Sequence, residues 1–240
     1  SETLPVRSMD ELGQLALNIN SLSRQLKNHI DRLKNELEQE KQLEQTRKTF
    51  ISNVSHELKT PLAVMKSCLT ILEDNIAPEK KVHYFASLQS QLDGMTELVA
   101  EMLELSKMES GTYHLETGPF NLGEALETAC EQFQELCAKR RLHLTVQARV
   151  LTAMGNRKLI VRVVSNFLSN AVRHTPEGGS IGVYTTVSGG VITVQVENQG
   201  EPIPEAACLH IFEQFYRVHP EKDGGSGLGL AICKAILDLH

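Results

Sequence analysis

Apolar residues recur three or four positions apart through residues 51–72, a spacing that places them on one face of a helix. They are Ile51, Val54, Leu58, Leu62, Met65, Leu69 and Leu72. A turn is expected at residues 73–78, followed by a second helix whose apolar positions are Phe85, Leu88, Leu92, Met95, Val99 and Met102. Two antiparallel helices with one apolar face each cannot bury those faces alone. The pattern therefore predicts a four-helix bundle made by two copies of the chain.

Upstream of this hairpin, coiled-coil spacing is kept by Leu26, Ile30, Leu33 and Leu37. A single solvated helix would leave these side chains in water, so a parallel two-stranded coiled coil is the favoured interpretation of residues 26–46. Residues 1–25 contain an Asp-Glu-Leu-Gly turn before a short amphipathic helix. Acidic residues in the first turn are typical of a helix start.

The periodicity changes after Gly111, a residue that predicts the end of the second helix. Strands are expected within 112–120 and at 142–146, 180–187 and 191–197. Helices are expected at 122–140 and at 158–173, and residues 224–231 are expected to open a last helix. Gly189 and Gly190 predict a hairpin turn between the last two strands. The fold class is therefore α+β, with strands mostly on one sheet and helices on one face.

Composition and charge exclude several classes of function. The 240 residues are 41% hydrophobic, which suits two small domains, or one domain with an extended helical part. A net charge of −6 argues against nucleic acid as the main partner. The five cysteines form no Cys-x-x-Cys pair and indicate reduced thiols in a cytosolic compartment. No apolar run approaches the roughly 18 residues that span a bilayer.

His56 is a candidate phosphoryl acceptor. On the heptad that begins at Ile51 it falls at position f, which points away from the apolar stripe. Glu57 lies beside it, and Thr60 lies one turn further along the same face. An exposed imidazole next to a carboxylate can act as a nucleophile. The alternative reading is a solvated surface histidine.

Two further patterns suit a bound nucleotide. Asn166 and Asn170 lie four residues apart on one predicted helix face, where two amide oxygens can hold a hydrated Mg²⁺. The glycine run at residues 224–229 opens an apolar helix, where backbone N–H groups can approach phosphate. Asparagine pairs on helices are common, and glycine-rich linkers look similar, so neither pattern decides the function alone.

The residues 56–62, His-Glu-Leu-Lys-Thr-Pro-Leu, resemble the phosphoacceptor motif of bacterial sensor histidine kinases at every position. The later motifs resemble that family in order, and nearly the whole chain is covered. The resemblance implies a dimeric helical hairpin followed by an α/β-sandwich ATP-binding domain of the GHKL type, with ATP and Mg²⁺ as cofactors. It assigns Mg²⁺ ligation to Asn166 and Asn170. It assigns nucleotide contacts to Arg173, His174, Asn198, Gly200, Phe212, Arg217, Gly225, Gly227, Leu228 and Gly229.

Within this resemblance, the aromatic motif at residues 211–217 would pack under a mobile lid at 218–224. The family usually has Asp-x-Gly-x-Gly at the adenine motif, where this chain has Asn198 and Pro202. The family also continues past the position of His240 into a glycine pair and at least one more strand. An ATP-binding domain without that strand is expected to be less stable.

The implied reaction is phosphorylation of His56 by ATP, with Glu57 orienting the imidazole or accepting its proton. The phosphoryl group would pass to an aspartate of a response regulator, and Thr60 could position water for dephosphorylating that regulator. The implied segments are a HAMP remnant at 1–25, the coiled coil at 26–46, a phosphoacceptor domain at 47–110 and an ATP-binding domain at 111–240. A transmembrane sensor is expected upstream, which makes the chain the cytoplasmic portion of a membrane protein. Two alternatives are a non-catalytic dimeric scaffold and an ATPase of the same superfamily.

Overall fold

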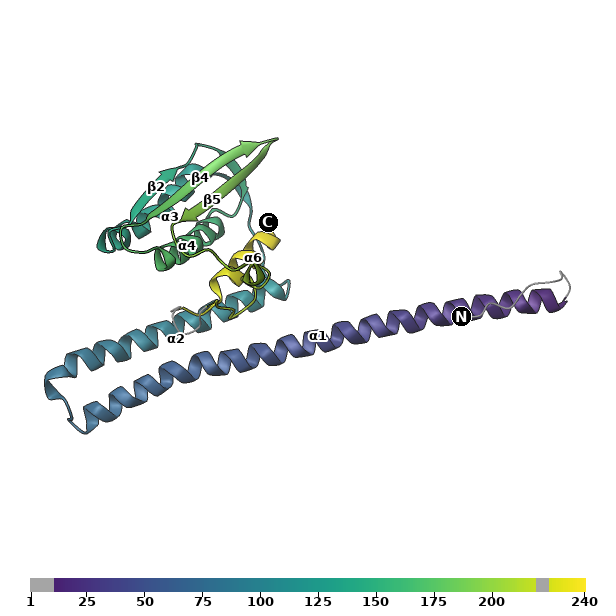
Figure 1. The fold of residues 1–240 in the computed structure, drawn as a ribbon, viewed down its shortest axis with the longest axis horizontal. Helices are drawn as coiled ribbons and strands as arrows, with labels where there is room; N and C mark the ends of the chain where they lie inside the picture. Colours follow the sequence, from purple (N-terminus) through teal and green to yellow (C-terminus); the bar gives the residue numbers. More distant parts are fainter. Residues whose placement is uncertain (1–10, 219–224) are drawn as a thin grey trace. The chain divides into compact units, whose positions relative to one another are not determined.

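The computed structural model describes residues 11–218 and 225–240 (Figure 1). Residues 1–10 of the predicted HAMP remnant and residues 219–224 of the predicted lid lie outside the described ranges. The chain divides after His56 into two units. Within the described ranges, none of the helices combines the length and the apolar character that a membrane span needs.

The first unit consists of the N-terminal part of a long helix, α1 (Glu11–Glu73). The predicted coiled-coil segment lies on this uninterrupted helix. Ion pairs between residues four apart join Arg32 to Glu36 and Lys48 to Glu44, at 2.8 and 2.7 Å. The predicted stripe of apolar residues is exposed: Leu26, Ile30, Leu33 and Leu37. This helix therefore leaves its apolar face in water within a single copy of the chain.

The second unit begins with the last turns of α1, which end at Glu73 as the turn prediction requires. A 3-10 turn, η1 (Pro78–Lys80), leads into α2 (Lys81–Glu109). Asn75 has a φ of 52°, a value that asparagine tolerates better than most residues. The Sγ atom of Cys68 on α1 lies 3.9 Å from the Oγ atom of Ser87 on α2, so the two helices form the predicted hairpin.

Within the described residues, five strands follow in two small sheets. Strands β1 (Gly118–Asn121) and β3 (Thr152–Gly155) pair antiparallel. Strands β2 (His143–Gln147), β4 (Ser180–Ser188) and β5 (Val191–Asn198) form a sheet in the order β2-β4-β5. Strand β4 is parallel to β2 and antiparallel to β5, and the predicted Gly189-Gly190 hairpin joins β4 to β5. Three of the five strands share one sheet, as predicted.

Two amphipathic helices pack on the three-stranded sheet: α3 (Leu122–Lys139) and α4 (Arg157–His174). Each helix is capped by the asparagine before it, Asn121 or Asn156, whose side chain accepts a hydrogen bond from the first turn. Alternate residues of β4 enter the core between sheet and helices. The most deeply buried side chains there are Leu126, Leu168, Ile181 and Val183.

A second apolar cluster lies between α2, α4 and α6 (Gly229–Leu239). Leu228, Ile232 and Ile236 are fully buried in it, and α2 contributes Leu98, Leu105 and Met108. Phe167 of α4 also packs against this second cluster. Helix α4 therefore has two apolar faces, one for the sheet and one for α6.

Two features of the local structure were not predicted. Strand β3 was not predicted, since its four residues are too few to show a clear alternation. Residues 211–217 form turns after a single helical turn, α5 (Glu205–Cys208). Phe215 within them has a φ of 64°, which is incompatible with a right-handed helix.

Candidate nucleotide and phosphoacceptor site

The candidate phosphoacceptor residues lie on α1. His56 and Thr60 are exposed, as position f of the heptad predicts for His56. The Glu57 carboxylate is only 27% exposed and forms an ion pair of 2.5 Å with the Arg217 guanidinium. In this structure Glu57 is therefore already held by a cation. The predicted role of Glu57 beside the imidazole and the predicted phosphate contact of Arg217 therefore involve two groups that are paired with each other in this structure.

Helix α4 carries four of the predicted nucleotide residues in order: Asn166, Asn170, Arg173 and His174. Asn166 and Asn170 are half-buried, whereas Arg173 and His174 are exposed at the end of the helix. The Nδ2 atom of Asn166 donates hydrogen bonds to the Gly229 carbonyl at 3.1 Å and to the Cys233 sulfur at 3.5 Å. The α4 helix thus provides one row of polar side chains that runs from α6 to its own C-terminus.

The glycine run lies against this row. Gly225 has a φ of +128°, and a Cβ atom there would lie 2.5 Å from the Arg173 guanidinium. The positive φ favours glycine at this position. Gly227 accepts a hydrogen bond of 3.0 Å from the backbone of Phe215, and the Leu228 side chain is fully buried. Because Gly229 also contacts Asn166, the glycine run lies against two predicted site residues of α4: Asn166, a predicted metal ligand, and Arg173, a predicted phosphate contact.

The predicted adenine motif approaches the other end of the same row. Asn198 is the last residue of β5, and Gly200 follows it. A Cβ atom at Gly200 would lie 2.6 Å from the carbonyl oxygen of His174. The loop after β5 therefore packs on the C-terminal end of α4. Two segments far apart in sequence, near residues 200 and 225, meet the last turn of one helix.

The two phenylalanines of the aromatic motif differ in burial. Phe212 is 40% exposed, and the packed aromatic residue is Phe215, which belongs to the second apolar cluster. Phe215 was not among the predicted site residues, although it lies within the same motif, two residues before Arg217. The side chain of Gln214 donates a 2.6 Å hydrogen bond to Glu109 of α2. This segment therefore contacts α2 and the glycine run.

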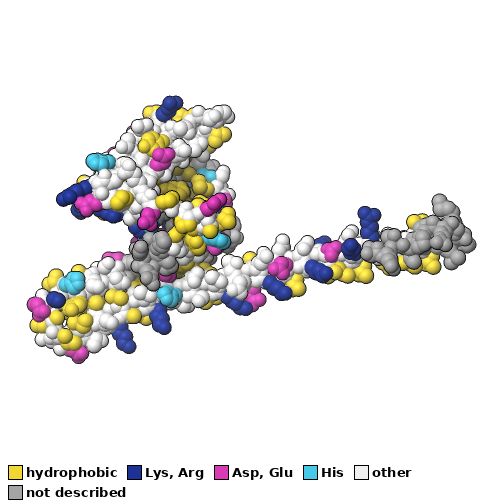
Figure 2. All heavy atoms as spheres, in the orientation of Figure 1, with side chains coloured by type: hydrophobic (Ala, Val, Ile, Leu, Met, Phe, Trp, Pro, Cys, Tyr) yellow, Lys and Arg dark blue, Asp and Glu magenta, His cyan; other side chains and the backbone are white. Residues whose placement is uncertain are grey.

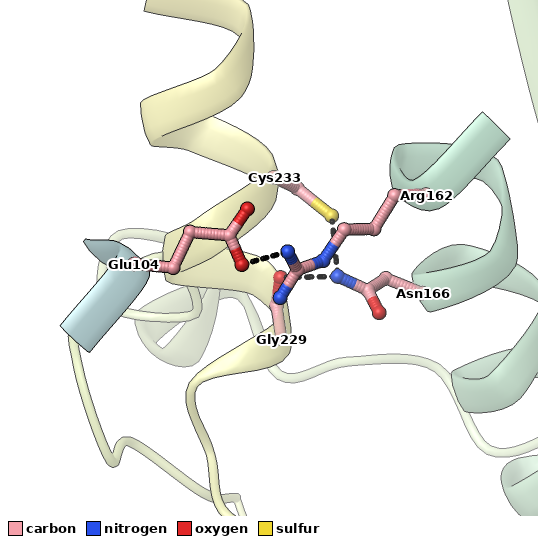
Figure 3. Close-up of polar contacts among 5 residues, drawn as sticks. All are labelled: Glu104, Arg162, Asn166, Gly229 and Cys233. Carbon is pink, nitrogen blue, oxygen red and sulfur yellow. Dashed lines mark hydrogen bonds and ion pairs between the residues drawn. The ribbon is translucent and has the colours of Figure 1, made fainter. Parts of the chain in front are cut away.

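Carboxylates of α2 contact the domain that carries the glycine run. Glu104 forms an ion pair with Arg162, which lies one turn before Asn166 on α4 (Figure 3). Glu101 accepts a 2.9 Å hydrogen bond from Ser226. Burial raises the pKa of the Glu101 carboxyl, and outweighs the hydrogen bond from Ser226, which lowers it. These contacts were not predicted, because they join residues more than 50 positions apart.

The residues fit Mg²⁺ and a phosphate group. Among the described residues, no cluster of three or more His, Cys, Asp or Glu side chains could hold a metal. The row on α4 instead offers neutral amide oxygens, which hard cations such as Mg²⁺ accept. Beside it, the exposed Gly225 backbone lies against the Arg173 guanidinium. A cationic group beside exposed backbone suits a phosphate.

Comparisons with known proteins agree with this arrangement. Residues 46–111 match the His Kinase A (phospho-acceptor) domain, and residues 155–240 match the histidine kinase-, DNA gyrase B- and HSP90-like ATPase family. The sensor protein VanSB of Enterococcus faecalis is 32% identical over 98% of this chain and 54% of its own length. The histidine-protein kinase BaeS of Escherichia coli is 31% identical over 97% of this chain and 48% of its own length. The chain spans about half the length of these curated relatives.

Solved structures show the same fold. The histidine kinase AdeS of Acinetobacter baumannii matches with a TM-score of 0.65 and 23% identity, over 76% of this chain and 86% of AdeS. The histidine kinase ThkA, solved in complex with the response regulator protein TrrA, matches with a TM-score of 0.65 and 26% identity. That match covers 78% of this chain and 53% of the ThkA chain. The predicted fold class, a helical hairpin followed by a GHKL-type ATP-binding domain, is confirmed. With both domain families matched in order and histidine kinases similar over nearly all of its length, the chain belongs to the bacterial two-component sensor histidine kinases.

Proposed function

We propose that this chain phosphorylates its own His56 from ATP and passes the phosphoryl group to an aspartate of a response regulator. The observation that carries the proposal is that one chain holds an exposed His56 within its phosphoacceptor domain and a glycine run folded against the polar row of α4. The first supplies an acceptor and the second a phosphate site. A scaffold without chemistry would need neither.

In the proposed reaction, a ring nitrogen of His56 attacks the γ-phosphorus of ATP. A nitrogen–phosphorus bond forms, the bond to the bridging oxygen breaks, and ADP leaves with the electron pair. The displaced imidazole proton passes to Glu57 or to water, once Glu57 has separated from Arg217. Released from Glu57, the Arg217 guanidinium is proposed to balance phosphate charge, together with the Arg173 guanidinium beside Gly225.

Asn166 and Asn170 are the proposed Mg²⁺ ligands. When bound, the ion neutralises part of the charge on the phosphate oxygens. Asn198 is proposed to accept a hydrogen bond from the adenine amino group. An asparagine oxygen can do so without the charge of the aspartate that the family usually has there.

The proposed partners are a second copy of the chain and a response regulator. The first is supported by the exposed apolar positions of α1 and α2, and the second by the ThkA structure, which contains such a regulator. We further propose the segment boundaries 1–25, 26–46, 47–110 and 111–240. We also propose that this chain is the cytoplasmic portion of a longer membrane sensor. The support is that it matches about half the length of its relatives, a sensor protein and a signal transduction kinase.

The test is incubation of the chain with γ-³²P-labelled ATP and Mg²⁺. The expected result is a label that is stable in base, labile in acid and absent from His56→Gln. His83→Gln is the matched control, because His83 is another exposed histidine of the hairpin, and it should keep the label. A dimer without label would indicate a scaffold, and release of phosphate without label would indicate an ATPase. Either of these results would overturn the proposal.

Thr60 is proposed to position water during dephosphorylation of the regulator, because it lies one turn from His56 and is exposed. Thr60→Ala should slow loss of phosphate from the phosphorylated regulator by about tenfold or more, the size expected for losing one positioning group. Phosphorylation of His56 should stay within about twofold. A regulator that loses phosphate at the same rate with either chain would contradict this role.

A further inference from the structure

The side-chain amide of Asn166 is held by two groups of α6. Its Nδ2 atom donates to the Gly229 carbonyl at 3.1 Å and to the Cys233 sulfur at 3.5 Å, and the amide oxygen points away from both (Figure 3). Cys233 is fully buried in the apolar cluster between α2, α4 and α6. Both hydrogens of the Asn166 amide therefore have an acceptor on the same neighbouring helix.

The chemistry of these acceptors fixes which way the amide faces. A backbone carbonyl can only accept, so the group against Gly229 must be the NH₂. The Cys233 sulfur lies 3.7 Å from the carbonyl oxygen of Val163, to which its S–H can donate. That leaves the sulfur lone pairs for Asn166. A flipped amide would place its oxygen against a carbonyl oxygen and a sulfur, and both hydrogen bonds would be lost.

We infer that Cys233, together with the Gly229 carbonyl, is a positioning residue that presents the Asn166 oxygen to Mg²⁺. The inference rests on the proposed role of Asn166 as a ligand. A cation needs the oxygen of an amide and is repelled by its N–H groups, so an amide that flips freely offers the correct face only part of the time. Partners behind a ligand act in this way at many metal sites.

The close approach of α6 makes this arrangement possible. The Gly229 backbone lies so near α4 that a Cβ atom there would be 3.8 Å from Cγ of Asn166. Cys233 follows one turn later on the same face of α6, and the fully buried Ile232 and Ile236 anchor the helix against the cluster. The apolar packing of α6 thus sets the distance at which its two acceptors meet the amide.

The first experiment is a Mg²⁺ titration of the full chain with trinitrophenyl-ATP as the fluorescent probe. Cys233→Ala removes the sulfur, and we expect it to raise the Mg²⁺ concentration at half-effect by about tenfold, the low end of the range for partners behind a metal ligand. Probe affinity without Mg²⁺ should not change. Cys233→Ser keeps an acceptor and should return the midpoint to within about threefold of wild type.

The matched control is Cys130→Ala. Cys130 is also buried, at 2% exposure, in the core between α3, α4 and the sheet, and so its loss leaves a similar cavity. Its Mg²⁺ midpoint should equal that of wild type. If Cys130→Ala shifts the midpoint as much as Cys233→Ala does, the effect comes from destabilisation and the inference is overturned.

Asn166→Ala separates this inference from the proposed function. Loss of Mg²⁺ dependence in Asn166→Ala, with a wild-type midpoint in Cys233→Ala, would overturn the positioning role alone. Unchanged Mg²⁺ dependence in Asn166→Ala would overturn the ligand role and with it the inference.

A second measurement needs neither metal nor a Cys233 variant. In ¹⁵N spectra of the wild-type chain, the side-chain NH₂ of Asn166, assigned by its loss in Asn166→Ala, should exchange with solvent at least about tenfold more slowly than that of the exposed Asn198. Equal exchange rates would show that the amide is not held and would overturn the inference.

Discussion

The two parts of this chain treat their apolar residues in opposite ways. In the ATP-binding domain, Leu126, Leu168 and Ile232 are fully buried within one copy of the chain. On the hairpin, Phe85 is 54% exposed and Leu92 is 53% exposed, at positions seven residues apart on α2. Figure 2 shows hydrophobic side chains gathered on the visible surface of the hairpin. The three-stranded sheet and its helices enclose a core within one copy of the chain, whereas the hairpin leaves apolar side chains exposed.

The reason is geometric. Sheet strands with helices on one face enclose a core when a single chain supplies both layers. Two antiparallel helices bury only the side chains at their mutual contact, so the remaining apolar positions are buried only when further helices pack against them. The core beneath the three-stranded sheet is therefore closed within one chain, whereas the outer apolar positions of the hairpin predict packing against a second copy. Three substitutions test this contrast.

The largest effect is expected from Leu92→Glu on α2. In a four-helix bundle this change would bury a carboxylate where a leucine packed, at a cost of about 3–5 kcal/mol per protomer. Sedimentation should show a dimer for the wild-type chain and a monomer for the variant, while nucleotide binding by the ATP-binding domain persists.

The control for Leu92→Glu is Val150→Glu, at a position that is 84% exposed in the ATP-binding domain. This variant should stay dimeric. If Leu92→Glu sediments as a dimer, the exposed stripe does not form the contact between copies and the contrast fails.

The next effect is expected from Leu168→Ala, which removes a fully buried side chain of α4. The free energy of unfolding of the ATP-binding domain should fall by about 2–5 kcal/mol, the usual cost of a large cavity. Urea denaturation followed by circular dichroism measures it, and the loss should be independent of protein concentration. Leu209→Ala, at 81% exposure, should change the value by less than about 0.5 kcal/mol. A loss that grows on dilution would mean that this core depends on the dimer.

The smallest effect is a dependence on alkaline pH. Burial, and to a lesser degree the neighbouring Cys137 and Glu127, raises the pKa of the Cys130 thiol to about 11 from its usual 9. The unfolded chain therefore ionises first, so the stability that this thiol contributes is complete below pH 9 and is lost between pH 9 and 11. Two pKa units correspond to about 2–3 kcal/mol at most.

The measurement is the free energy of unfolding at pH 8.5 and pH 11 for the wild-type chain and Cys130→Ala. The variant should be less stable at pH 8.5, yet it should lose less stability on going to pH 11. Cys208→Ala, at an exposed cysteine, should follow the wild type. If Cys130→Ala and the wild type lose the same free energy of unfolding between pH 8.5 and pH 11, then water reaches the Cys130 thiol in the folded domain.

Much of the fold could be predicted from the sequence, because long periodic segments leave few alternatives. The ends of five elements lie within about one residue of the expected ranges: α3, α4, β2, β4 and β5. Helix α2 contains all the apolar positions expected for the second helix of the hairpin. The failures are short or irregular. Strand β3 has four residues, and the turns around Phe215 depend on packing against Gly227. A strand of four residues is too short to show a period, and a turn held by a residue twelve positions away leaves no periodic pattern.

The sequence by itself determined the order of the elements, the family and the residue types that chemistry requires, because periodicity and short motifs are local properties. Only the tertiary structure brought Gly229 and Cys233 to Asn166, Arg217 to Glu57, and Glu104 to Arg162. These contacts join residues more than 50 positions apart, and no local pattern records them. The contacts of Asn166 and Arg162 exist because α6 packs between α2 and α4, and that packing depends on the shape of the whole cluster.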